Sequence, residues 1–421
     1  MELKKYKLGD VADIVNGATP STHNSENYDG SIIWITPKDL SGQKQKIIRR
    51  GQRNISEIGF NNCSAQMIPP YNILMSSRAP IGLLAINENE CCTNQGFKNL
   101  VLDKSICDTD YMYYYLQFHM KEIEALGSGT TFKEISKSAL QGIEIRLPDL
   151  EKQRDIAKCL SDLDRKIELN KQINDNLEAM ARQLYDYWFV QFDFPNEEGK
   201  PYKSSGGTMV WNEKLKHEIP QKWSDCVLGD YIGRITNGLN PRKNFVLGSG
   251  NNYYVTIRSL VGTTINWNNC DRCDDEALSK INSRSQLQIG DIIFSAIGTI
   301  GRTYYILEEP TNWNISETSF TLRAKENVPN DFFYGMLRSN EIQIKADKAA
   351  MGSTLRCLVM DSLCSLQYIE IPSYMMKLFA AKVSPLYRQI HRNNKEIAEL
   401  TKQRDELLPL LMNGQASVNS D

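Results

Sequence analysis

The sequence predicts an α+β protein in which two similar, mostly β domains are each followed by a long helix. Three observations support this fold class: an internal repeat, short apolar runs broken by turn residues, and two heptad patterns. We expect the two helices to pair as an antiparallel coiled coil, which would give the chain a pseudo-two-fold symmetry. At 421 residues the chain is also too long for one ordinary core.

The internal repeat starts with Leu8-Gly9-Asp10, which returns 220 residues later as Leu228-Gly229-Asp230. Five further segments return in the same order: Trp34–Lys38 as Tyr254–Arg258, Arg78–Gly82 as Ile297–Gly301, Asp110–Tyr113 as Asp331–Tyr334, Ser128–Thr131 as Met351–Thr354, and Leu147-Pro148 as Ile371-Pro372. Chance similarity among common Gly and Thr motifs is the alternative. The shared order, with an offset that drifts by only a few residues, favours a duplication.

The repeat and the turn residues together predict the domain boundaries. Each mostly β half contains short apolar runs, such as Ile32–Ile35, that end at Gly, Pro or Asn. We expect a first β domain at 1–147, a central helix at 148–192, a linker at 193–220, a second β domain at 221–371, a distal helix at 372–413 and a tail at 414–421.

Both long helices carry a seam of apolar residues spaced alternately by four and three. The first seam runs from Ile156 to Trp188 and the second from Phe379 to Leu411. A polar residue within such a seam can fix the register of a helix pair. We interpret Asn170 and Asn393 in this way, with an ordinary surface asparagine as the alternative. Pro385 should kink or delay the second helix.

Composition and charge exclude several classes of protein. The formal net charge is −2, which excludes a strongly basic nucleic-acid coat protein but not a DNA-binding protein with a local basic face. No apolar run is long enough for a membrane helix, and Met1–Lys5 does not begin a secretory signal. Ten scattered cysteines without such a signal favour reduced thiols. We therefore expect a cytoplasmic protein.

A search for catalytic and metal-binding motifs finds no convincing candidate. The sequence contains no Gly-rich phosphate loop ending in Gly-Lys-Ser or Gly-Lys-Thr. In Ile68-Pro69-Pro70-Tyr71, isoleucine stands where an amino-methyltransferase loop needs a hydrogen-bond acceptor. Cys270 and Cys273 have zinc-type spacing, but no second ligand pair follows them. We therefore expect no catalytic residue, no metal site and no cofactor on this chain.

Polar side chains suited to DNA lie at matching places in both halves, although a solvated loop remains the alternative for each of them. The first half has a basic stretch suited to phosphates, and Asp39 is its only acid. Its candidates are Lys38, Lys44, Lys46, Arg49, Arg50 and Arg53. Residues that could read base edges or bind phosphate through a turn are Ser76, Ser77, Arg78, Asn94, Gln95, Ser128, Thr130, Thr131 and Lys133. Their counterparts in the second half are Arg258, Ser295, Thr299, Arg302, Ser316, Glu317, Ser353, Thr354 and Arg356.

The order of domains and helices resembles that of the specificity subunit of a type I restriction–modification enzyme. The entry motifs Leu8-Gly9-Asp10 and Leu228-Gly229-Asp230 carry part of this resemblance, and Leu147-Pro148 with Gln153 carries more. The most specific stretch is the linker that runs from Trp188-Phe189 through Phe192–Pro195 and Gly199–Gly207 to Ile219-Pro220. The resemblance covers essentially the whole chain.

The resemblance implies two target-recognition domains, each reading one half of a split, asymmetric DNA site. The helix pair would act as a spacer and would dock two methylation subunits, which the restriction subunits then join. S-adenosylmethionine, ATP and Mg²⁺ would belong to those partners. The halves differ where Asn94-Gln95-Gly96 is answered by Ser316-Glu317-Thr318. This difference leaves the base-reading roles open in the second half.

The sequence therefore predicts a non-catalytic protein that recognises duplex DNA within a methyltransferase and endonuclease assembly. Two other functions remain as alternatives. One is a self-contained DNA methyltransferase or nuclease, which the missing motifs argue against. The other is a coiled-coil scaffold with two protein-binding domains.

Overall fold

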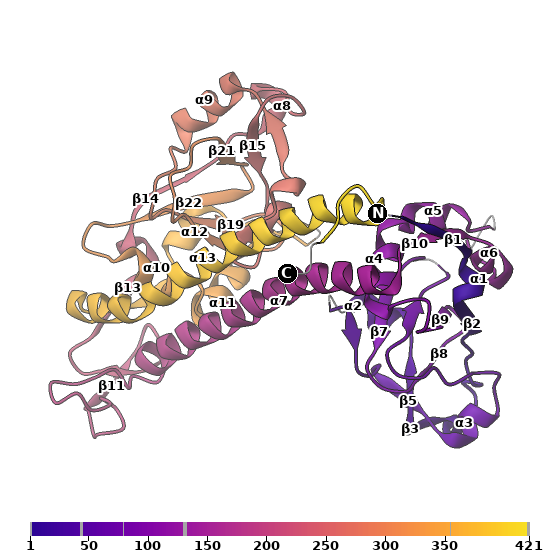
Figure 1. Ribbon diagram of the computed structural model, residues 1–421. Helices are drawn as coiled ribbons and strands as arrows, with labels where there is room; N and C mark the ends of the chain where they lie inside the picture. The colour runs from indigo at the N-terminus through magenta and orange to yellow at the C-terminus, as the bar shows by residue number, and fades with distance from the viewer. Residues whose placement is uncertain (1, 43–44, 79, 129–132, 354, 419–421) are drawn as a thin grey trace. The chain divides into compact units, whose positions relative to one another are not determined.

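The computed structural model describes residues 2–42, 45–78, 80–128, 133–353 and 355–418. It confirms the α+β class, with short strands in several sheets and two long helices, α7 (Leu150–Tyr185) and α13 (Ser373–Met412) (Figure 1). The chain divides into two compact units. Unit 1 comprises Met1–Glu168 and Ala398–Asp421, and unit 2 comprises Leu169–Ile397. Both long helices therefore contribute residues to each unit.

Unit 1 is built on two sheets and a short strand pair. The larger sheet has the order β2 (Ala12–Asn16), β9 (Lys98–Leu102), β6 (Ile73–Met75), β7 (Leu84–Asn87) and β4 (Ile47–Ile48). The smaller sheet has the order β5 (Arg53–Ile55), β3 (Tyr28–Ile35) and β8 (Cys92–Thr93), and β1 (Lys4–Lys7) pairs with β10 (Glu144–Leu147). The short helices are α1 (Leu8–Val11), α2 (Pro37–Gly42), α3 (Glu57–Asn61), α4 (Thr109–Phe118), α5 (Met120–Ala125) and α6 (Lys137–Gln141).

Helix α4 connects the sheets of unit 1 to the long helices. It starts at an Asp108 cap, whose carboxylate accepts a hydrogen bond from the Tyr111 amide at 3.0 Å. Its buried Tyr111 belongs to one apolar cluster with Ile156 and Leu160 of α7 and with Leu411 near the end of α13. Burial of this shared face is what joins the start of α7 and the end of α13 to unit 1.

Unit 2 has the same kind of architecture. Its larger sheet has the order β14 (Ile232–Asn237), β22 (Ser319–Ala324), β19 (Ile292–Ser295) and β20 (Thr303–Tyr305). Its smaller sheet has the order β18 (Asp271–Cys273), β15 (Asn252–Val255) and β21 (Trp313–Ile315), and β13 (Ser224–Val227) pairs with β23 (Gln367–Glu370). The hairpin β16 (Leu260–Val261) and β17 (Thr264–Ile265) and the helices α8 (Pro241–Asn244), α9 (Asp275–Arg284), α10 (Asn330–Leu337), α11 (Asn340–Ala349) and α12 (Met360–Cys364) complete it.

The strand topology confirms the predicted repeat. The order β2-β9-β6-β7 in unit 1 corresponds to β14-β22-β19-β20 in unit 2. In both smaller sheets the central strand is parallel to one neighbour and antiparallel to the other. The entry motifs also form the same turn. Asp10 accepts a hydrogen bond from the Lys7 amide at 3.0 Å, and Asp230 accepts one from the Val227 amide at 3.1 Å.

A close backbone approach follows the first strand of the larger sheet in each unit. A Cβ atom on Gly17 would lie 1.8 Å from the carbonyl oxygen of Asn94, and one on Gly238 would lie 1.8 Å from that of Ile315. Only glycine fits at such a distance. These two glycines therefore hold the loops after β2 and β14 against the chain near β8 and β21.

The predicted linker is an ordered part of unit 2. It contains the hairpin of β11 (Met209–Asn212) and β12 (His217–Pro220), and a π-helical turn, η2 (Asp186–Val190), precedes it. The Asp193 carboxylate accepts hydrogen bonds from the amide and hydroxyl of Ser204 at 2.7 and 2.6 Å. The ring of Phe194 stacks on Trp223 with a centroid distance of 4.9 Å. Gly, Pro and Ser residues predict the turns of this segment, but they do not reveal its aromatic packing.

Buried asparagines join the two long helices within unit 2. Asn393 donates to Asn174 at 2.8 Å, Asn174 donates to Asn394 at 2.8 Å, and Asn170 donates to Glu396 at 3.0 Å. Residue numbers rise on one helix as they fall on the other, so these segments are antiparallel. Asn393 is buried in this pair, whereas Asn170 is partly exposed. Their roles in fixing register remain predictions.

Helix α13 starts at Ser373 and continues without a break through Pro385. The prediction that this proline delays the helix is therefore wrong. Proline removes one backbone donor and crowds the preceding turn. The apolar face around it, which includes Phe379, Val383 and Tyr387, is buried in the core of unit 2. Burial of this face outweighs the local cost of the proline.

We expect Asn174→Ala to destabilise unit 2 by about 1–3 kcal/mol, because the buried amide of Asn393 would lose its acceptor. The matched control is Asn176→Ala, which makes the same change at an exposed position of the same helix. Urea denaturation of both variants measures the difference between them. Equal stabilities would show that the asparagine contacts contribute nothing to the helix pair.

Candidate nucleic-acid interface

Backbone hydrogen bonds bring four distant segments of unit 1 together. The Ala18 amide donates to Thr93 O at 2.9 Å, and the Ser77 amide donates to Gly96 O at 2.7 Å. The Ile135 amide donates to Ser77 O at 3.0 Å. We call residues 17–20, 76–78, 94–96, 128 and 133–135 loop cluster 1. It contains the predicted residues Ser76, Ser77, Arg78, Asn94, Gln95, Ser128 and Lys133.

Ser76 and Ser77 of loop cluster 1 are fully buried and make internal hydrogen bonds. The Ser76 hydroxyl donates to Pro80 O at 2.7 Å and accepts from the Leu83 amide at 2.8 Å. The Ser77 hydroxyl donates to Gly96 O at 3.2 Å. Their contacts shape the loops, while Arg78, Gln95, Ser128 and Lys133 are exposed.

A network of charges fixes Arg78. Its Nε donates to Glu134 Oε2 at 2.9 Å, and Lys98 Nζ lies 3.2 Å from Glu134 Oε1. Burial raises the pKa of Glu134, but the hydrogen bonds from Arg78 and Lys98 outweigh it and hold that pKa below its ordinary value. The Glu134 carboxylate is therefore ionised at neutral pH. It orients the Arg78 guanidinium, which remains half exposed.

Gln95 belongs to the same loop cluster as Arg78. The Thr19 hydroxyl donates to the side-chain oxygen of Gln95, and the neighbouring Asn94 accepts from the Gly96 amide at 2.9 Å. The sequence search missed Thr19. The repeat offered a signal for it, because Thr19 follows Gly17 as Asn240 follows Gly238.

Unit 2 forms the equivalent arrangement. The Ala296 amide donates to Thr318 O at 2.9 Å, and the Leu358 amide donates to Ala296 O at 2.8 Å. We call residues 238–240, 295–302, 316–318, 351–353 and 355–358 loop cluster 2. The predicted residues Ser295, Thr299, Arg302, Ser316, Glu317, Ser353 and Arg356 all lie within it.

The same hydroxyl geometry recurs in loop cluster 2. The buried Ser295 donates to Thr299 O at 2.6 Å and accepts from the Arg302 amide at 2.8 Å, as Ser76 does in unit 1. Ser316 is also buried, and its hydroxyl contacts that of Thr318 at 2.6 Å. The side chains of Thr299 and Ser353 are exposed.

The charged side chains of loop cluster 2 have partners of their own. Arg302 donates to Ile257 O and Leu260 O at 3.1 Å each. Arg356 Nη1 lies 2.9 Å from Asp347 Oδ2. Glu317 accepts from Asn240 and from the Tyr254 hydroxyl, both at 2.8 Å. The position that corresponds to Arg78 holds Ile297, so the two clusters present different chemistry.

Three cations of the predicted basic stretch, Lys46, Arg49 and Arg53, are paired within unit 1, and Arg53 Nε lies 3.4 Å from Asp29 Oδ1. Lys46 Nζ lies 2.6 Å from Asp110 and 2.8 Å from the Ser161 hydroxyl, and its side chain is only 17% exposed. Arg49 lies 2.5 Å from Glu88. All three acids lie outside the basic stretch, so the local excess of basic residues overstates the free positive charge.

Lys38, Arg50 and Arg258 are exposed, and among the described residues none of their side chains has an ion-pair or hydrogen-bond partner. Lys38 and Arg50 line a polar hollow of about 690 Å³, together with Gln52, Arg53 and Asn54. Arg258 lies in the short helix η4 (Ile257–Ser259), at the place in unit 2 that corresponds to Lys38. The predicted residues Lys44, Thr130, Thr131 and Thr354 lie outside the described residues.

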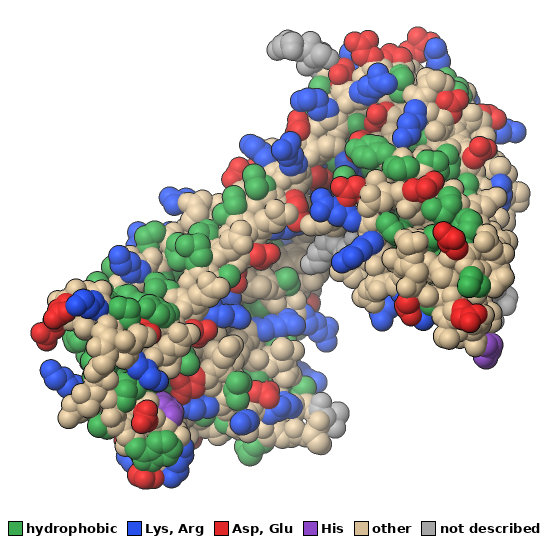
Figure 2. Space-filling view, turned by 90° about the horizontal axis from the view of Figure 1, so that it is seen from below, with side chains coloured by type: hydrophobic (Ala, Val, Ile, Leu, Met, Phe, Trp, Pro, Cys, Tyr) green, Lys and Arg blue, Asp and Glu red, His purple; other side chains and the backbone are tan. Residues whose placement is uncertain are grey.

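Positive charge is local on the face that Figure 2 displays. Lys and Arg side chains lie among Asp and Glu side chains there, without a continuous basic surface. This agrees with the net charge of −2. On this face, positive charge is therefore carried by separate side chains rather than by one basic surface.

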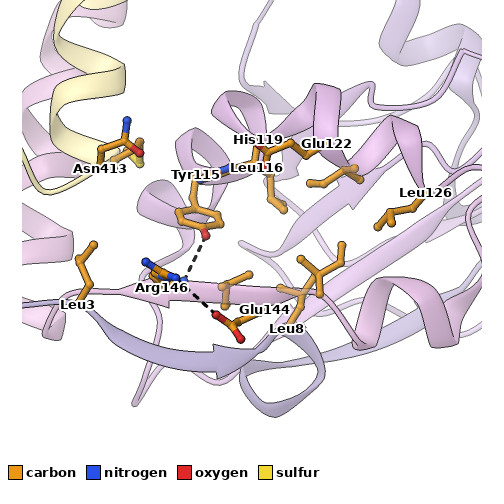
Figure 3. A pocket seen from close by; sticks show the side chains of 14 residues that line it. Leu3, Leu8, Tyr115, Leu116, His119, Glu122, Leu126, Glu144, Arg146 and Asn413 are labelled. Atoms are coloured by element: carbon orange, nitrogen blue, oxygen red, sulfur yellow. Dashed lines mark hydrogen bonds and ion pairs between the residues drawn. The ribbon is translucent and has the colours of Figure 1, made fainter.

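A separate pocket of about 480 Å³ lies in unit 1 between the β1–β10 strands, helices α4 and α5, and the end of α13 (Figure 3). Its lining is mostly apolar, with Leu3, Leu126 and Met412 among the contributors. His119 lies 2.8 Å from Glu122 at its rim. The lining contains no Ser, Thr, Cys or Lys side chain.

The described part of the chain contains no cluster of metal-ligating side chains and no helix that could span a membrane. All ten cysteines are free thiols, and no three His, Cys, Asp or Glu side chains gather as metal ligands among the residues described. Within the same residues, no helix combines the length and the apolar character needed to cross a bilayer.

Comparisons with known proteins agree with this geometry. A family model for the type I restriction modification DNA specificity domain matches residues 1–179. The chain is 32% identical over 418 residues to the type I restriction enzyme MjaIX specificity subunit of Methanocaldococcus jannaschii, covering 98% of this chain and 93% of that protein. It is 24% identical to the HindI specificity subunit of Haemophilus influenzae, covering 98% and 99% of the two chains.

A solved structure shares the fold. The S subunit of a type I restriction–modification system from M. genitalium superposes with a TM-score of 0.59 at 17% identity, covering 100% of this chain and 97% of that one. At this identity the likeness concerns the fold alone.

We expect Glu134→Gln to lower the stability of unit 1 at neutral pH by up to about 1 kcal/mol. Because the native pKa of Glu134 is lowered, its contribution is present above the ordinary value of 4.5 and is lost as the pH falls through the native pKa. Urea denaturation of the wild type and of Glu134→Gln at decreasing pH should therefore show that their free energies of unfolding converge. Glu124→Gln is the control, because Glu124 is exposed and forms no ion pair with any described residue. If the two free energies of unfolding still differ at acidic pH, the ion pairs of Glu134 with Arg78 and Lys98 are not the source of the stabilisation.

Proposed function

This chain belongs to the specificity subunits of type I restriction–modification enzymes, and on that premise we propose that loop clusters 1 and 2 each read one half of a split, asymmetric site in duplex DNA. The chain recognises DNA sequence, while catalysis resides in its partner subunits. The observation that carries the proposal is that the two loop clusters share a scaffold and differ in their exposed side chains.

The two loop clusters meet the requirements for reading unlike half-sites. Buried Ser76 and Ser295 make the same hydrogen bonds, so the loops after β6 and β19 have the same support. The side chains above this support differ. Arg78 and Gln95 offer donors in unit 1, whereas Glu317 offers acceptors in unit 2. Different donors and acceptors select different base edges in the major groove.

Phosphate contact is assigned to the exposed cations beside these clusters. Lys38 and Arg258 are equivalent in the repeat, and Arg50 lies in the same hollow as Lys38. Contacts of this kind hold a protein in register on the duplex without carrying sequence information. Lys46 and Arg49 contribute less in this proposal, because each already has an acidic partner.

The long helices are assigned to spacing the recognition domains and to docking partners. We propose that two methylation subunits bind along α7 and α13 and that restriction subunits join them in the cytoplasm. Exposed apolar side chains support such a role for α7: Leu169 and Met180 are each 54% exposed, and Ile173 is 37% exposed. We assign S-adenosylmethionine, ATP and Mg²⁺ to those partners and none of them to this chain.

Family membership over nearly the full length also weighs against the two other functions. A self-contained methyltransferase or nuclease would need catalytic motifs that the sequence lacks. A scaffold with two protein-binding domains would not need different base-reading side chains on one repeated support. Mapping methylated bases in DNA treated with the complete complex tests the proposal directly, because it reveals whether the recognised sequence is split.

We expect exchange of residues 221–371 for the matching domain of a relative to change one half of the recognised site and leave the other half and the gap unchanged. Each half-site has its own loop cluster in this proposal, so the two should be separable. Methylation mapping with the rebuilt complex measures the outcome. A change in both half-sites would contradict the proposal that each loop cluster reads one half-site. A change in neither half-site would also contradict it.

We expect the triple variant Lys38→Ala, Arg50→Ala, Arg258→Ala to weaken binding to all duplexes alike. Each lost phosphate contact should reduce the slope of log K against log salt by about 0.9. Gel-shift titrations over a range of salt concentrations measure this slope. The charge-matched control removes Lys121, Lys137 and Lys222, which are exposed and lie outside the candidate interface. An unchanged slope in the triple variant would place these three cations away from DNA.

A further inference from the structure

One pair of side chains occupies equivalent places in the two loop clusters. The Asn94 amide donates to Ile35 O at 3.0 Å, and the Ser316 amide donates to Val255 O at 2.9 Å. The residues that follow them, Gln95 and Glu317, are therefore equivalent. In each unit the first strand of the larger sheet leads into a loop that reaches across to this residue.

The loop that contacts this residue is held in an equivalent way in each unit. In unit 1 the indole of Trp34 donates to Ala18 O at 3.1 Å, and in unit 2 the Tyr254 hydroxyl donates to Leu239 O at 2.8 Å. Trp34 and Tyr254 correspond in the repeat. The next residues along the two loops are Thr19 and Asn240, which donate to Gln95 and Glu317 respectively.

Gln95, the side chain in unit 1, has hydrogen-bond donors available. Gln95 is exposed, and its amide oxygen already accepts a hydrogen bond from the Thr19 hydroxyl. The NH₂ group of the amide carries two hydrogens, and no described residue accepts either of them. In this arrangement Gln95 faces an incoming ligand chiefly as a donor.

The side chain in unit 2 has the opposite polarity. Glu317 accepts from Asn240 through one carboxylate oxygen and from Tyr254 through the other, both at 2.8 Å. Burial, together with the nearby Glu317, raises the pKa of Tyr254, so the tyrosine remains a donor. Asn240 uses its own oxygen to accept from the Arg242 amide at 2.9 Å. No described Lys or Arg forms an ion pair with Glu317.

A carboxylate without a cation is unfavourable in an interface with a polyanion. The phosphates repel it, and bringing it out of water without a donor costs free energy. The donors that duplex DNA offers in the major groove are the amino groups of cytosine and adenine, and Glu characteristically accepts from cytosine N4. An amide donor in the equivalent place selects instead a base edge that presents an acceptor.

We infer that Gln95 and Glu317 are one specificity-determining position used twice with opposite hydrogen-bond polarity. Gln95 selects a base edge that presents an acceptor, and Glu317 selects a base edge that presents an amino group, with cytosine favoured. The inference rests on the proposed function, since it requires that loop clusters 1 and 2 face the bases. It explains why a single repeated scaffold reads two unlike half-sites.

The decisive variants exchange the two chemistries in the full complex. Glu317→Gln should alter preference at one base pair of one half-site, from an edge with an amino group toward an edge with an acceptor. The change in discrimination should be about 5- to 150-fold. Gln95→Glu should make the reverse change in the other half-site only. The readout is methylation of a duplex library in which each base pair of the wild-type site is randomised in turn.

Two further variants keep the inference falsifiable. Glu326→Gln removes an exposed carboxylate elsewhere in unit 2 and should leave both half-sites intact. Tyr254→Phe keeps the Glu317 charge but removes one of its donors, so it should weaken discrimination at the same base pair that Glu317→Gln alters. If Glu317→Gln proves inactive, Tyr254→Phe still decides, because unchanged discrimination at every base pair overturns the inference.

The remaining outcomes separate the inference from the proposed function. The Glu317→Gln and Gln95→Glu complexes could be active and still recognise both wild-type half-sites. That result would overturn the inference, but the proposal that each loop cluster reads one half-site would remain. A wild-type complex that recognises no split sequence would instead overturn the proposed function itself. If each variant alters a single base pair in its own half-site, and the two changes have opposite hydrogen-bond polarity, the result would support both the inference and the proposed function.

Discussion

The hydroxyl group of a buried serine at the end of one central strand controls the geometry of each recognition domain. Ser76 follows β6 and Ser295 ends β19, and each hydroxyl bridges the two sides of the loop that comes next. Because the side chain is buried and both of its bonds go to backbone groups, the loop has little freedom to change shape. The exposed side chains can then vary without changing the support beneath them.

Electrostatics inside each unit decide which charged residues remain available to a ligand. Lys46 and Arg49 are neutralised by Asp110 and Glu88, while Lys38 and Arg50 remain unpaired in the described structure. Glu134 shows the opposite use of an acid, since it orients Arg78 while leaving that side chain half exposed. A chain with a net charge of −2 can therefore still present positive charge at selected points.

The architecture can be predicted from the sequence because the patterns that indicate it are periodic or duplicated. The repeat predicts two similar domains, and the alternating spacing from Ile156 to Trp188 predicts the first long helix, although the last residues form the π-helical turn η2. The site is harder to predict. Sequence alone does not show that Ser77 is buried beneath Gly96, or that Thr19 reaches Gln95 across 76 residues of chain. Those contacts depend on tertiary packing, which no local pattern encodes.

The division of the chain between the units bears on the order in which they form during synthesis. Unit 2 is one continuous stretch, Leu169–Ile397, so all its contacts become available before the C-terminal residues are made. Unit 1 needs both ends, because Ile156 and Leu160 share an apolar cluster with Leu411 and Met412. We therefore expect the segment translated first to complete its core last. Loss of the segment around Leu411 would then harm the N-terminal domain most, although the two lie far apart in the sequence.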